Sequence, residues 1–113
     1  MRAAFVFVLI AAVASVAAAG IIDDERNIID QVARTMNSAT TNDAVVGALQ
    51  QLASALGDTK ALSELRADTG SDEFNVGLRS LLADVNRAMW VFYDDKPTLD
   101  HLRTFAKRIH AVL

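Results

Sequence analysis

The chain has 113 residues, of which 52% are hydrophobic and 22% are charged, and its formal net charge is −3. This length is enough for one domain and too short for two of ordinary size. The acidic balance argues against nucleic acid or an anionic membrane surface as a partner, because both require a concentrated positive field.

The first 19 residues are typical of a secretory signal peptide. Arg2 gives a positive start, residues 3–16 form an apolar run, and three alanines occupy 17–19, where signal peptidase requires small residues. We expect cleavage between Ala19 and Gly20 and release from the cell, with a bacterial periplasm as the alternative destination. An uncleaved membrane anchor is the other interpretation, but the run is short for a span and rich in alanine.

The mature domain would then comprise residues 20–113, with 10 basic and 14 acidic residues and a formal net charge of −4. It contains no cysteine. Small secreted domains commonly rely on disulfides to supplement a small core. This chain must instead gain its stability from helix packing, self-association, a partner or a ligand.

Apolar residues at helical spacing predict the first helix and its boundaries. The residues from Ile28 to Met36 follow the 3.6-residue period, and the acidic residues 23–25 stand where we expect the helix to begin. The polar segment 37–42 should end it. Thr41 or Asn42 can cap a second helix that runs to Gly57, a residue suited to a left-handed helix end.

Three further segments complete the predicted architecture. A short helix should start at Asp58 or Thr59, and a long one should cover 71–93 behind a cap at Ser71. Pro97 should terminate the long helix, and Thr98 should cap the last one. No stretch alternates with the period of a strand, so we predict an all-α fold, a compact bundle of four to five helices.

The predicted helix over 71–93 is apolar on two sides. At about 100° per residue, its broad core face collects eight residues: Phe74, Leu78, Leu81, Leu82, Val85, Ala88, Met89 and Phe92. Val76, Ala83 and Trp90 form a narrower seam on the opposite side. Three polar residues flank this seam: Arg79, Asn86 and Arg87.

Two arrangements explain the seam. In the simpler one, other helices cover both sides, and Trp90 lies at a bundle end against the 37–42 loop or the last helix. In the other, the seam stays exposed and forms an interaction site, because a large aromatic surrounded by Arg and Asn is typical of interfaces.

The residues that usually carry catalysis are sparse. His101 and His110 lie nine residues apart and therefore on opposite faces of one helix, so they cannot form a two-histidine metal site. The acidic residues 23–25 and 94–95 lack the alternating spacing of a calcium loop. We therefore predict neither an enzyme nor a bound cofactor or metal.

Two glycines fall inside predicted helices, where each costs about 1 kcal/mol relative to alanine. Gly47 and Gly77 can mark a close approach of two helices. Alternatively, a missing side chain can leave room for a ligand in a lined cavity.

Two functions from different classes fit these observations. The first is a secreted, non-catalytic protein that acts through a protein-interaction or self-association surface. The alternative is an extracellular carrier of a lipid or small apolar molecule in the bundle core. Four large residues could line such a pocket, although plain core packing also explains them: Met36, Met89, Phe92 and Phe105.

Overall fold

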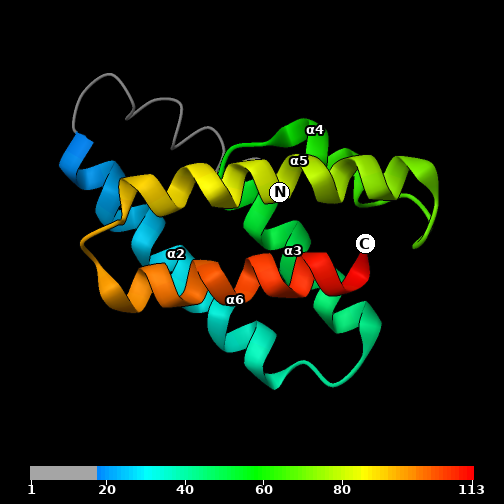
Figure 1. Cartoon of the computed structure of the whole chain (residues 1–113), viewed down its shortest axis with the longest axis horizontal. Coiled ribbons are helices and arrows are strands. Elements are labelled where there is room, and N and C mark those ends of the chain that lie inside the picture. Colours follow the sequence, from blue (N-terminus) through cyan, green and yellow to red (C-terminus); the bar gives the residue numbers. More distant parts are fainter. Residues whose placement is uncertain (1–17) are drawn as a thin grey trace.

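Five helices make up the part of the chain that the computed structural model describes, residues 18–113 (Figure 1). They are α2 (Ala18–Ser38), α3 (Asn42–Ala55), α4 (Thr59–Glu64), α5 (Asp72–Val91) and α6 (Lys96–Val112). This confirms the predicted all-α bundle. Most of the expected signal peptide lies outside the described residues, and only its last two alanines appear, as the start of α2.

Three helix starts follow the predicted capping pattern. The side chain of Thr41 accepts a hydrogen bond from the N–H of Ala44, Asp58 accepts one from Ala61, and Ser71 accepts one from Phe74. Each cap satisfies a backbone donor that has no partner within its own helix. The turn before α4 passes through Gly57, whose φ of 76° lies in the left-handed region expected there.

Two predicted helix starts are wrong. Helix α2 begins at Ala18, so the acidic residues 23–25 lie in its second turn and not at its start. Helix α6 begins at Lys96, and its N-cap is Asp95, whose carboxylate accepts from the N–H of Thr98. Pro97 is tolerated here because the first turn of a helix does not use its missing N–H.

The helices form a closed ring. Each packs against its neighbours in sequence, and α6 returns to contact α2. Figure 1 shows α5 and α6 side by side and antiparallel, with α2 and α3 crossing behind them. Because α4 and α6 both pack on α5, the position of these neighbours decides which side of α5 remains uncovered.

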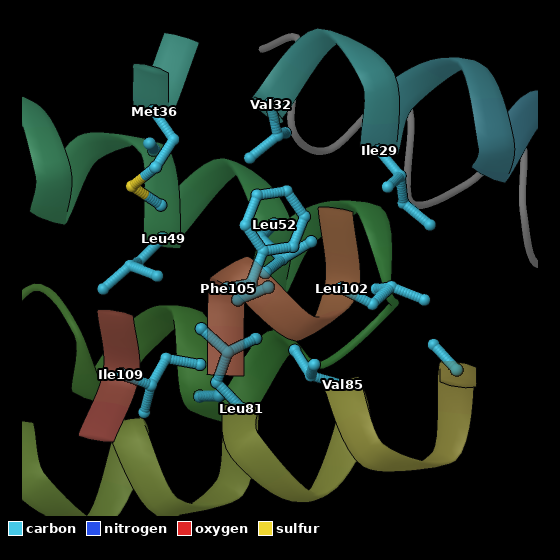
Figure 2. Packing of buried hydrophobic residues seen from close by; sticks show 14 of the residues in the cluster. Ile29, Val32, Met36, Leu49, Leu52, Leu81, Val85, Leu102, Phe105 and Ile109 are labelled. Atoms are coloured by element: carbon cyan, nitrogen blue, oxygen red, sulfur yellow. The ribbon is translucent and has the colours of Figure 1, made fainter. Parts of the chain in front are cut away.

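The core lies inside this ring and draws on every helix. Figure 2 shows Phe105 at its centre among leucine, isoleucine and valine side chains from α2, α3, α5 and α6. The predicted core face of α5 is confirmed, since Phe74, Leu78 and Leu81 have no exposed surface. At the end of the chain, Leu113 is 44% exposed and lies outside this core.

Gly47 in α3 and Gly77 in α5 have different surroundings. A Cβ added at Gly77 would lie 2.8 Å from Glu64 Cβ and 3.2 Å from the backbone nitrogen of Leu65, so α4 and α5 approach closely here. A Cβ added at Gly47 would meet nothing within 4 Å. Close helix packing therefore explains Gly77 and leaves Gly47 without a steric reason.

Between residues 18 and 113, no helix is both long enough and apolar enough to cross a lipid bilayer.

Candidate functional site

The outer face of α5 is open to solvent along its whole length. All six residues of the predicted seam and its flanks are exposed: Val76, Arg79, Ala83, Asn86, Arg87 and Trp90. The exposed fraction of Trp90 is 81%. The expectation that other helices cover both sides of this helix is therefore wrong. The neighbouring helices α4 and α6 leave this outer side free.

Further apolar surface lies next to Trp90 where α5 ends. Val91 is 52% exposed and Tyr93, in the turn that follows, is 71% exposed. The sequence pattern assigned neither residue to the core face or to the seam. Both residues stand at the end of a helix with two apolar sides, next to Trp90 in the sequence. That proximity could have indicated that they extend the exposed apolar surface. We call the six seam and flank residues together with Val91 and Tyr93 the α5 outer face.

Charges are distributed unevenly along the α5 outer face. Asp72 and Glu73 are exposed in the first turn of α5, whereas Arg79 and Arg87 lie further along. The guanidinium of Arg87 contacts the carboxylate of Asp84, with 3.3 Å between Nη1 and Oδ1, yet 73% of the Arg87 side chain stays exposed. The face therefore has an acidic beginning and a basic remainder.

The four candidate pocket residues belong to the packed core. Met36 and Phe105 are fully buried, Phe92 is 2% exposed, and Met89 packs against the core from its edge. They line neither of the two surface hollows described below. A ligand could reach Met36, Phe92 and Phe105 only if the helices separated.

A groove runs over the surface between α2, α3 and the end of α4. Its volume is about 580 Å³, and Gly47 contributes to its wall. The apolar side chains in the wall come from Ile28, Val32 and Leu62, and Arg66 is the charged residue among those that line it. We call this the Gly47 groove. Gly47 thus borders an open surface groove and not the enclosed cavity considered as an explanation for it.

A buried carboxyl group at the junction of α4 and α5 was missed by the sequence analysis. Asp84 is 9% exposed, and burial together with a hydrogen bond to the Asp58 carboxyl raises its pKa to about 7. Asp84 Oδ2 is buried and has no N–H or O–H donor among the described residues. The available signal was a single acid at the margin of an apolar helix face, between Leu81 and Val85.

Asp58 carries several contacts at this junction. The hydrogen bond from the Asp84 carboxyl lowers the pKa of Asp58, and the Ala61 N–H and the Ser80 hydroxyl act in the same direction. Asp84 also lines a smaller hollow of about 190 Å³ beside Glu25, whose pKa is raised by burial. The pKa values of the two neighbouring carboxyls are thus shifted in opposite directions, as is usual when two acids lie close enough to interact.

The histidines lie apart from the carboxyl pair. His101 Nε2 lies 3.3 Å from Asp30 Oδ1 and links α6 to α2, whereas His110 is exposed near the chain end. Across residues 18–113, no three His, Cys, Asp or Glu side chains gather in a way that could hold a metal ion.

Comparisons with protein-family models, with curated protein sequences and with solved structures give no match.

Proposed function

We propose that this is a secreted, non-catalytic interaction protein that acts through the α5 outer face, and that a second copy of the chain is the partner that this face fits best. The observation that carries the proposal is the 81% exposure of Trp90. A tryptophan buries a large apolar area when it is covered, and interfaces are enriched in this residue. Leaving it in water beside Val91 and Tyr93 creates surface that association can cover.

The spacing of the apolar residues supports pairing with another helix. Val76, Ala83 and Trp90 repeat every seven residues. This is the period at which one helix presents a continuous narrow seam to another. The small side chain of Ala83 at the middle of the seam permits close approach of a partner helix.

The charges support an antiparallel pair of copies. Asp72 opens the face, and Arg79 and Arg87 follow later on the same side. In an antiparallel arrangement the acidic beginning of one α5 meets the basic remainder of the other, and the two-fold symmetry repeats this contact. Two chains with a net negative charge repel each other in general. Pairing the acidic beginning of one α5 with the basic part of the other therefore favours the antiparallel orientation.

Sedimentation velocity on protein obtained by secretory expression of the full chain tests this proposal. We expect a dimer whose fraction rises with protein concentration, and we expect Trp90→Ala to shift it to monomer while far-ultraviolet circular dichroism stays unchanged. Val112→Ala is the matched control, because it truncates an exposed apolar side chain on α6 and should leave the dimer intact.

The same experiment can refute the proposal. A wild-type protein that remains monomeric at every concentration rules out the second copy. Dimers that persist in Trp90→Ala place the contact elsewhere on the molecule.

A further inference from the structure

Gly47 is the one helical glycine of α3, and the packing of the bundle gives it no role. It stands well inside the helix, where glycine costs about 1 kcal/mol relative to alanine because it loses more backbone freedom on folding. A side chain could be accommodated here, since an added Cβ meets no atom within 4 Å. Because Gly47 has no side chain, it leaves the groove between α2, α3 and α4 wider at this point of its wall.

The size of the Gly47 groove suits a small molecule. Its volume of about 580 Å³ falls within the range of about 300–1,000 Å³ that is usual for ligand sites. The half-buried side chains of Ile28 and Leu62 supply the accessible apolar wall, and buried Val32 lies behind it. Neutral hydrogen-bonding side chains complete it, among them Gln31, Gln51 and Ser54.

One end of the groove is fixed by a contact between helices. The side-chain amide of Gln50 donates to the carbonyl oxygen of Leu65 at 3.0 Å, which joins α3 to the end of α4. Arg66 follows directly and is the charged side chain in the wall. Within residues 18–113 it forms no ion pair. A ligand with a negative group at this end would therefore meet a cation that no carboxylate already neutralises.

From these observations we propose that the Gly47 groove binds an amphiphile with a linear apolar body and a single anionic head, the head lying at Arg66. The apolar wall covers the body, the open position at Gly47 leaves room for it, and the guanidinium receives the head. This site lies on a different surface from the α5 outer face and does not depend on the proposed self-association.

Isothermal titration with dodecanoate, at concentrations below micelle formation, tests the proposal on protein from secretory expression of the full chain. We expect saturable binding of one dodecanoate per chain, and weaker binding of dodecanol, which has the same chain length without the charge. Arg66→Gln should weaken dodecanoate binding about tenfold, the effect of one charge-assisted contact, and should bring it close to that of dodecanol.

Two further variants separate loss of the site from loss of the fold. Gly47→Leu should abolish binding by filling the groove, whereas Gly47→Ala should stay folded and retain binding, because its methyl group occupies little of the space. Arg108→Gln is the control for charge, since it removes an exposed arginine on α6 and should leave binding unchanged.

Three results would overturn the proposal. The first is the absence of saturable dodecanoate binding. The second is unchanged binding in folded Gly47→Leu, and the third is equal loss of affinity in Arg66→Gln and Arg108→Gln.

Discussion

The buried carboxyl group of Asp84 lies beside the carboxyl group of Asp58, and this pairing joins the middle of α5 to the N-cap of α4. Two carboxyl groups can hydrogen-bond to each other only when one of them holds a proton. The pKa shifts favour Asp84 as its holder: burial and the Asp58 neighbour raise the pKa of Asp84 to about 7, whereas the pKa of Asp58 is lowered. Arg87 and Glu25 are the other charged groups near Asp84 in this region.

This pair predicts a stability that falls as the pH rises from about 4 to about 7. In that window the unfolded chain has released the Asp84 proton while the folded chain retains it, so folding binds protons and is favoured at the lower pH. The expected loss is about 1–3 kcal/mol, the usual cost of a buried polar group without a partner. Urea unfolding at several pH values measures it.

Asp84→Asn should remove this pH dependence. Its amide can donate to Asp58 as the protonated acid does, but it does not titrate in this range. Asp68→Asn, a change at an exposed acid in the turn before α5, should keep the wild-type profile. A wild-type slope in Asp84→Asn would mean that another group titrates.

The contrast between Phe105 and Trp90 gives a second prediction. Phe105 is fully buried, so Phe105→Ala should lower the free energy of unfolding by about 3–5 kcal/mol. Trp90 is 81% exposed, so Trp90→Ala should change it by no more than about 0.5 kcal/mol. Chemical denaturation at a protein concentration low enough to suppress association compares the two. A large loss in Trp90→Ala would show that the side chain is covered within the monomer.

Gly47 and Gly77 should respond to replacement by alanine with opposite signs of the change in stability. Gly47→Ala should raise the free energy of unfolding by up to about 1 kcal/mol, because it improves helix propensity and meets open space. Gly77→Ala should lower it by about 1–3 kcal/mol, because the new methyl group collides with α4 at Glu64 and Leu65. Thermal and urea unfolding distinguish these outcomes, and stabilisation in both variants would contradict the close contact at Gly77.

Asp95 links the start of α6 to α2, so replacing it should lower the free energy of unfolding more than replacing Asp94. It caps α6 and accepts a hydrogen bond from Arg26 of α2, while Arg26 also lies 5.9 Å from the centre of the Phe92 ring. Against the effect of partial burial, hydrogen bonds from Thr98 and Arg26 hold the pKa of Asp95 below its usual range.

Asp95→Ala should therefore cost about 1 kcal/mol for the cap alone. Asp95→Asn should cost less, because asparagine also caps helices well. Asp94→Ala, at the exposed adjacent acid, is the control and should be nearly neutral. Equal losses in Asp94→Ala and Asp95→Ala, measured by urea unfolding, would contradict the special role of Asp95.

The predicted signal peptide can be tested directly. Intact mass spectrometry of the protein secreted from expressing cells should give a chain that starts at Gly20. A chain of full length that stays with the membrane fraction would favour the anchor interpretation. Replacing the alanine at 19 with a bulky residue should impair cleavage at this position.

Much of the bundle could be predicted because its signals are local. Helical spacing of apolar residues identified the core face of α5, and side-chain caps located the starts of α3, α4 and α5. The start of α6 was misplaced because Asp95 and Thr98 are both good caps, and the contact of Asp95 with Arg26 joins residues 69 apart in sequence. A contact between residues so far apart produces no periodic pattern in the sequence from which it could be predicted.

The sequence by itself determined that the chain is helical, that α5 has two apolar sides, and which residues form each side. Those properties depend on spacing within one segment and on the preferences of individual residues. Only the tertiary structure decided that the side with Trp90 faces solvent, that Gly47 borders a groove, and that Asp84 is buried beside Asp58. Each of these depends on where neighbouring helices lie, and packing between helices far apart in the chain sets that position.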